Sequence, residues 1–199
     1  MSELIVSVSG MRGVVGESLT REVVARFTRA AASVLEDGAI VVSRDGRANG
    51  IELADHVGCT LSAGGRHVIQ AGITSTPTTG ILVRKLGAAG GIQISASHNP
   101  VQYNGIKLFD ATGRVLTARQ GEQVRDLYLD PEKHVLSSET PGTIQECADT
   151  LSDHLDLVLA TVDSAAIRRQ NYRVLLDANH GAGGLLGRRL LETLGCQVH

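Results

Sequence analysis

Residues 91–100, Gly-Ile-Gln-Ile-Ser-Ala-Ser-His-Asn-Pro, join a short apolar run to a cluster of small and polar side chains. The run at 91–94 is typical of a buried strand, and the polar cluster begins where that strand is predicted to end. Ligands of open α/β sheets bind outside the carboxyl ends of the strands. We therefore expect the loop that follows residue 94 to line a binding site.

Short aliphatic runs alternate with helix-length amphipathic segments on both sides of this loop. Further strands are predicted at residues 4–8, 39–43 and 67–70, and a hairpin at 106–116 is expected to turn over residues 110–113. Thr20 predicts the start of one helix, and a capping box of Thr117 and Gln120 that of another. Two more helices are expected at 51–63 and after Pro77. The alternation predicts an α/β fold with a mixed, mostly parallel sheet sandwiched by helices.

The composition changes at residues 130–142, where proline, serine, threonine and glycine gather. We interpret this stretch as a linker that ends a first α/β domain at residues 1–142. Four apolar residues at helical spacing between 151 and 162 predict one long connecting helix. Strand signals at 172–177 and 197–198 then flank a glycine loop and a helix. Residues 143–199 are therefore expected to hold the connecting helix and the beginning of a second, incomplete α/β domain.

The charge balance excludes several classes of partner. The 199 residues include 19 Lys and Arg against 21 Asp and Glu, a net charge of −2, so we expect no nucleic acid or acidic membrane as a partner. The first residues lack the basic stretch of a signal peptide, and their apolar run is too short to span a membrane. Three widely spaced cysteines lack metal-ligand spacing and indicate a reducing compartment, so the cytoplasm is the expected location.

The loop after residue 94 offers a nucleophile and groups that bind anions. Ser97 can act as a nucleophile or carry a phosphate, and His98, Asn99 and nearby backbone amides can hydrogen-bond a dianion. An Asn-Pro turn with a serine cap explains the same residues without chemistry. A serine hydrolase is a third interpretation, but the G-x-S-x-G elbow is missing.

The glycines around Arg12 suggest a second phosphate-binding element. Arg12 stands between Gly10 and Gly13, where a flexible loop is expected to bring its guanidinium toward a phosphate. The spacing of Gly10, Gly13 and Gly16 misses the dinucleotide fingerprint. The second glycine loop, at 181–184, lacks the last glycine of that fingerprint and a P-loop lysine, so NAD and ATP are not expected.

Several motifs together resemble one enzyme family. Residues 95–100, Ser-Ala-Ser-His-Asn-Pro, with Asn-Gly-Ile-Lys at 104–107, are similar to the phosphoserine loop of the α-D-phosphohexomutases, which include phosphoglucomutases, phosphomannomutases and phosphoglucosamine mutases. Segments 9–13, 44–47 and 72–77 fall in the order that this family would have them. Residues 175–184 resemble the opening of the family's second domain.

The resemblance implies a phosphoenzyme that interconverts hexose or hexosamine 1-phosphate and 6-phosphate through a bisphosphate. Ser97 would carry the phosphoryl group, with His98 and Lys107 as the other catalytic residues. Mg²⁺ would bind an oxygen of the Ser97 phosphate, because phosphoserine and a sugar phosphate together bring a large negative charge. The residues implied to bind the phosphosugar are Arg12, Asn99, Asn104, Arg44 and Arg47. For Arg44 and Arg47, an ion-pair network with Asp45 that braces the loops is an equal alternative.

The chain departs from the family in what it lacks. No D-x-D-x-D metal loop is present, nor are the family's later sugar-binding and phosphate-binding loops. We therefore expect an amino-terminal portion of a mutase that is inactive alone; the alternative is a non-catalytic sugar-phosphate-binding domain. Apolar surface left uncovered on the incomplete second domain would favour a homodimer. The serine at position 95 resembles the motif of phosphoglucosamine mutases, whereas Tyr103-Asn104 resembles the phosphomannomutase and phosphoglucomutase branch. The identity of the sugar in the substrate therefore stays undecided between hexose and hexosamine.

Overall fold

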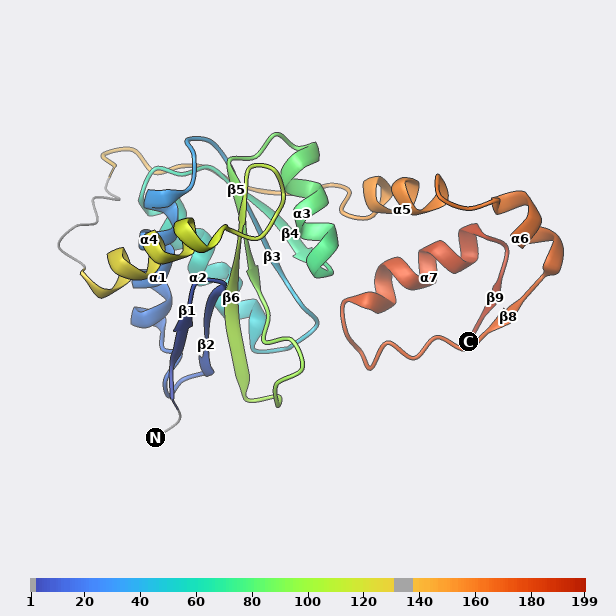
Figure 1. The fold of residues 1–199 in the computed structure, drawn as a ribbon, viewed down its shortest axis with the longest axis horizontal. Helices are drawn as coiled ribbons and strands as arrows, with labels where there is room; N and C mark the ends of the chain where they lie inside the picture. The colour runs from blue at the N-terminus through green and yellow to red at the C-terminus, as the bar shows by residue number, and fades with distance from the viewer. Residues whose placement is uncertain (1–2, 131–137) are drawn as a thin grey trace.

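The computed structural model describes residues 3–130 and 138–199, and it has a large body followed by a smaller segment (Figure 1). Most of the predicted linker at 130–142 lies outside the described residues. None of the described helices combines the length and apolar composition that crossing a membrane requires.

A seven-stranded mixed sheet forms the centre of the large body. Its central strands β3 (Ile40–Arg44), β4 (Val68–Ile73) and β5 (Gly90–Ile94) run parallel, with α2 (Gly50–Ala63) and α3 (Thr76–Lys85) as the crossovers between them. The antiparallel strands β6 (Tyr103–Asp110), β2 (Gly10–Val14) and β1 (Ile5–Ser7) extend one side in that order, and β7 (Ile144–Glu146) pairs parallel to β4 on the other. The predicted mixed α/β fold is confirmed.

Helices cover both faces of this sheet, as Figure 1 shows. Helices α1 (Arg21–Val34), α2 and α4 (Ala118–Leu129) pack on one face, and α3 packs on the other. The alternation of β3 supplies both cores, since Ile40 and Val42 join the first and Val41 joins the second. The Thr20 cap and the Thr117–Gln120 capping box are present as predicted.

The amino-terminal residues differ from the prediction. Residues 10–14, expected as a loop, form strand β2, which pairs with β6 and buries Met11 in the larger core. Gly10 has a φ of 132°, and a Cβ there would lie 1.9 Å from the carbonyl oxygen of Ile106. Glycine therefore allows β2 to approach β6. In the predicted hairpin at 106–116 the turn is present, but its second arm makes only one bridge, between Phe109 and Val115.

The smaller segment contains two short helices in place of the predicted long one. Helix α5 (Ser152–Leu159) ends before α6 (Ser164–Gln170), whose first turn is capped by the Asp163 carboxylate, which accepts the N–H of Ala166 at 2.9 Å. An aspartate cap starts a new helix and interrupts the old one. The segment continues as β8 (Arg173–Val174), α7 (Gly183–Thr193) and β9 (Gln197–Val198), and β8 and β9 pair in parallel.

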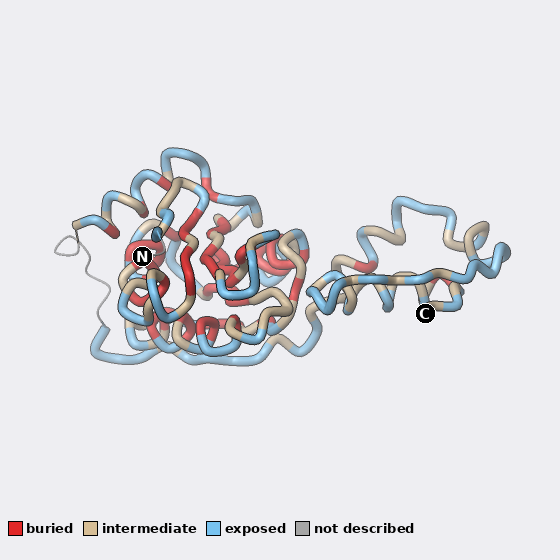
Figure 2. The backbone as a smooth tube through the Cα atoms, turned by 90° about the horizontal axis from the view of Figure 1, so that it is seen from below, coloured by how far each residue is buried: buried red, intermediate tan, exposed pale blue. Residues whose placement is uncertain are grey.

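Burial is uneven between the two parts. Figure 2 shows buried backbone concentrated in the large body, whereas the smaller segment is mainly intermediate or exposed. Within the described part of that segment, Leu175 is 83% exposed, and Leu155 and Leu194 are its buried apolar residues.

Candidate functional site

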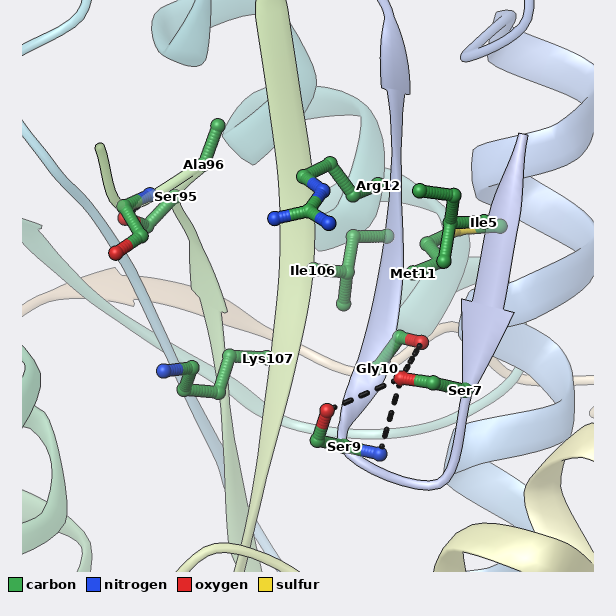
Figure 3. A pocket seen from close by; sticks show the side chains of 11 residues that line it. Ile5, Ser7, Ser9, Gly10, Met11, Arg12, Ser95, Ala96, Ile106 and Lys107 are labelled. Atoms are coloured by element: carbon green, nitrogen blue, oxygen red, sulfur yellow. Dashed lines mark hydrogen bonds between the residues drawn. The ribbon is translucent and has the colours of Figure 1, made fainter. Parts of the chain in front are cut away.

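The site begins on a part of the sheet that α3 leaves uncovered. Residues paired across antiparallel strands project to the same side, so the pairing of Lys107 with Gly10 and Gln93, and of Arg12 with Gly105, puts both cations on the face that α3 packs against. Figure 3 shows the side chains of Arg12 and Lys107 extending across that face from β2 and β6 toward β5. The sheet therefore gathers two positive charges near the end of β5.

Ser97 occupies a strained position in the loop that follows β5. It has a φ of 55°, in the left-handed region that costs an L-residue about 1–2 kcal/mol. The Ser97 N–H donates to Ser95 Oγ at 3.2 Å, and Asn99 donates to the Ala96 carbonyl from its backbone at 3.1 Å and from its side chain at 2.7 Å. These bonds hold Ser97 exposed at a tight turn, with His98 Nδ1 3.3 Å from its hydroxyl.

A first hollow of about 180 Å³ joins Ser97 to the two cations. Residues from β1, β2, the β5 loop and β6 line it, and none of them is a carboxylate. Arg12 Nε is buried without a hydrogen-bond partner among the described residues. An unpaired buried donor and a lysine beside an exposed serine hydroxyl suit a phosphate dianion. The structure thus brings together Ser97, Arg12 and Lys107.

Arg47 binds the Ser97 loop and does not line this first hollow. Its Nη1 donates to the carbonyls of Pro100 at 2.9 Å and Tyr103 at 3.3 Å, and its Nη2 to those of Ser97 at 3.0 Å and Asn99 at 2.6 Å. Its Nε faces the Asp45 carboxylate at 3.4 Å. All five N–H groups of the guanidinium are engaged. These contacts favour the alternative role of Arg47, that of bracing the Ser97 loop, and its phosphate-binding role stays a prediction.

Asn104 and Arg44 line neither of the two hollows beside Ser97. Asn104 is fully buried; its side-chain amide donates to Asn49 Oδ1 and its Oδ1 accepts the N–H of Gly105, both at 2.9 Å. Arg44 ends β3 and lines a separate hollow with Asp55 and Glu146. Asn104 ties the start of β6 to the turn before α2, and Arg44 lies outside the two Ser97 hollows, so neither placement supports the predicted phosphate contact, which stays a prediction.

Ser97 borders a second hollow, of about 570 Å³, on its other side. The walls of this hollow are the 45–48 turn, the Ser97 loop and residues 178–182 of the smaller segment. His180 lies in that last wall and was not predicted as a site residue. A histidine within a glycine loop was the available signal, but only the packing of the two parts brings it to the same hollow as Ser97.

The donor set for a divalent metal is incomplete. Among residues 3–130 and 138–199, no group of three or more His, Cys, Asp and Glu side chains lies close enough together to hold a metal ion. Mg²⁺ prefers octahedral oxygen coordination by carboxylates, phosphates and water. The described residues therefore do not supply a complete Mg²⁺ site, and an oxygen of a phosphate on Ser97 would be one of its ligands.

Comparisons with known proteins agree with these observations. A family model described as "Phosphoglucomutase/phosphomannomutase, alpha/beta/alpha domain I" matches residues 4–134. A phosphoglucosamine/phosphogalactosamine mutase of Sulfurisphaera tokodaii is 32% identical over 192 residues, which are 96% of this chain and 42% of the relative. A phosphoglucomutase/phosphomannomutase of Thermococcus kodakarensis is 32% identical over 95% of this chain and 42% of its own length. The chain therefore spans less than half the length of these relatives.

Solved structures share the fold over the same extent. The crystal structure of a protein from Thermus thermophilus superposes on 100% of this chain with a TM-score of 0.86 and 28% identity, and 46% of that protein is covered. A phosphoglucomutase/phosphomannomutase family protein from Burkholderia thailandensis gives a TM-score of 0.74 and 26% identity, with 98% of this chain and 43% of the other covered. The likeness includes both the large body and the smaller segment.

Proposed function

The chain belongs to the phosphoglucomutase/phosphomannomutase family, and on that basis we propose that Ser97 carries the transferable phosphoryl group of a phosphohexomutase. The observation that supports this most is the position of Ser97. Its hydroxyl lies at a strained, exposed turn beside a hollow that contains Arg12 and Lys107. Strain of this kind persists where the surrounding structure fixes a functional residue.

The proposed reaction is an intramolecular phosphoryl transfer, an isomerisation overall. The phosphoryl group leaves the oxygen of Ser97 for the free hydroxyl of a hexose or hexosamine monophosphate; that hydroxyl loses its proton, the Ser97 oxygen gains one, and a bisphosphate forms. Ser97 then takes back the phosphoryl group from the other position, so that the isomeric monophosphate leaves and the phosphoenzyme is restored. Each cycle therefore regenerates the phosphorylated enzyme, and no nucleotide is consumed.

The neighbouring residues have separate proposed roles. Arg12 supplies a guanidinium for phosphate oxygens, and Lys107 supplies an ammonium that offsets the charge developing in transfer. His98, with Nδ1 3.3 Å from the hydroxyl, accepts the proton of Ser97 when that oxygen attacks. Asn99 holds the turn through its bonds to Ala96.

The complete gene product tests this proposal through its mass. After incubation with hexose 1,6-bisphosphate and Mg²⁺, the intact mass should rise by one phosphoryl group, and glucose 1-phosphate should remove it. Ser97→Ala should abolish the gain. Ser95→Ala is the matched control, because it removes a hydroxyl of the same loop that lines the same hollow.

Two outcomes would contradict the proposal. If phosphorylation persists in Ser97→Ala and disappears in Ser95→Ala, the phosphorylated residue is Ser95 and not Ser97. A protein that binds the bisphosphate but never gains a phosphoryl group would instead be a non-catalytic sugar-phosphate-binding domain.

A further inference from the structure

Ser97 has a hollow on each side, and the two differ in where their walls come from. The first is built from strands of the large body, whereas the second has one wall from residues 178–182, between β8 and α7. From this second hollow we propose that His180 donates a hydrogen bond to the phosphoryl group on Ser97. The inference rests on the proposed function, and it adds a phosphate-contacting residue from the smaller segment.

Close backbone packing fixes where the 178–182 loop lies. A Cβ on Gly46 would stand 2.6 Å from the carbonyl oxygen of His180 and 3.2 Å from Cα of Gly181, so the two loops touch where Gly46 has no side chain. The next residue in the same turn, Arg47, binds the carbonyls of Ser97 and Asn99. One short turn therefore contacts His180 on one side and the Ser97 loop on the other.

The backbone of the 178–182 loop is held in an unfavourable conformation. Asn179 and His180 have φ values of 47° and 53°, both in the left-handed region. The Asp177 carboxylate accepts the N–H of Asn179 at 2.9 Å, and the Gly181 N–H donates to Ala178 at 2.7 Å. Two successive non-glycine residues in this region occur where the surroundings impose them.

Among the ionisable residues that line the second hollow, His180 differs from the others in having no partner among the described residues. The ionisable residues of this lining are Asp45, Arg47 and His180. Asp45 and Arg47 are paired with each other at 3.4 Å, and Arg47 also holds the loop carbonyls. The His180 side chain has no hydrogen bond or ion pair among the described residues, so its ring nitrogens remain for a ligand. A charge-assisted bond from imidazolium to a phosphoryl oxygen is one of the stronger hydrogen bonds in proteins.

The test does not depend on turnover, because a carboxylate at position 97 imitates the charge of the phosphoryl group. Ser97→Asp is compared with Ser97→Asn, which has the same shape without charge, and both residue types tolerate the left-handed backbone. The pKa of His180 is followed by NMR in the 199-residue chain at low ionic strength. We expect the pKa of His180 to be higher in Ser97→Asp than in Ser97→Asn by at least about 0.3 pH unit. Coulomb's law gives this shift for two unit charges within roughly 10 Å of each other in water.

A second pair of variants tests the contact at Gly46. Gly46→Ala should displace the 178–182 loop and reduce the Ser97→Asp effect on His180. Gly183→Ala is the matched control, since a Cβ there would meet nothing within 4 Å, and it should leave the effect unchanged. The pKa of His67, on another part of the chain, should not differ between Ser97→Asp and Ser97→Asn.

Each outcome separates this inference from the proposed function. Equal His180 pKa values in Ser97→Asp and Ser97→Asn would overturn the inference, whether or not Ser97 is phosphorylated in the complete gene product. A raised pKa together with a Ser97 that never accepts a phosphoryl group would support the juxtaposition and overturn the mutase proposal.

Discussion

At the scale of single residues, Ser97 and Arg47 show how the loop after β5 is held. The left-handed turn at Ser97 is offset by bonds from the loop to Ser95 and Ala96 and by the four carbonyl contacts of Arg47. The sequence predicted Ser97, Arg12 and Lys107 as site residues, and the structure places them around one hollow. It did not predict that Arg47 would be fully engaged, because that depends on four carbonyls turning toward one guanidinium.

The strained backbone at Ser97 predicts that a substitution which relieves the strain keeps or raises the stability of the fold while it removes the function. Ser97→Gly should leave the free energy of unfolding unchanged or raise it by up to about 1 kcal/mol, because glycine adopts the left-handed conformation without a Cβ penalty. The same variant should not be phosphorylated. Urea denaturation of the 199-residue chain measures the first effect.

Ser95→Gly is the control for that measurement. It removes the hydroxyl that accepts the Ser97 N–H, at a position without positive φ, and should lower the free energy of unfolding by about 1 kcal/mol. If Ser97→Gly is destabilised as much as Ser95→Gly, the strain argument is wrong.

At the scale of elements, local sequence signals predicted the parallel strands and the starts of several helices. Strand β2 depends on pairing with another strand, which local signals do not report. Strands β3, β4 and β5 were predicted because they are aliphatic, and α1, α3 and α4 because caps or proline mark where they begin. Strand β2 was missed because Gly10, Arg12 and Gly13 interrupt its apolar pattern, and it becomes a strand only against β6. The long helix was predicted wrongly because apolar periodicity outweighed the Asp163 cap.

The contact between α3 and α5 predicts a pH dependence. His154 Nδ1 lies 2.9 Å from Thr78 Oγ1, and burial lowers the pKa of His154 below its ordinary value of 6.5. The folded state therefore favours the neutral ring, so the stabilisation is complete above pH 6.5 and decreases as the pH falls below it. Hydrogen-exchange protection of α5 amides, corrected for intrinsic rates, should be lower at pH 5 than at pH 7.5.

His154→Gln separates this effect from general acid sensitivity. Its amide can still bond Thr78 but does not titrate, so its α5 protection should change little between the two pH values. An equal loss in His154→Gln would exclude His154 as the cause.

At the scale of the whole molecule, the smaller segment completes one wall of a site that begins in the large body. Strand β7 joins the seven-stranded sheet through β4, so we propose that the division between the two parts falls after Glu146 and not at residue 142. His180 was not foreseen because no local pattern reports how the two parts pack together. The chain also spans only about 42% of the relatives' length.

The incomplete set of metal ligands among the described residues predicts what the 199 residues can do alone. With glucose 1-phosphate, hexose 1,6-bisphosphate and Mg²⁺, the isolated chain should not form glucose 6-phosphate at a rate comparable to an intact mutase, because its metal ligands are incomplete among the described residues. A coupled assay for glucose 6-phosphate checks this. Turnover at the rate of an intact mutase would show that the 199 residues suffice.

The most direct test of the central claim follows the phosphoryl group off Ser97. The complete gene product, phosphorylated and freed of small molecules, is mixed in one turnover with glucose 1-phosphate and followed by ³¹P NMR. We predict that the phosphoserine signal disappears as glucose 1,6-bisphosphate appears in equal amount. Release of the group as inorganic phosphate, or a phosphoserine signal that glucose 1-phosphate leaves unchanged, would contradict the account.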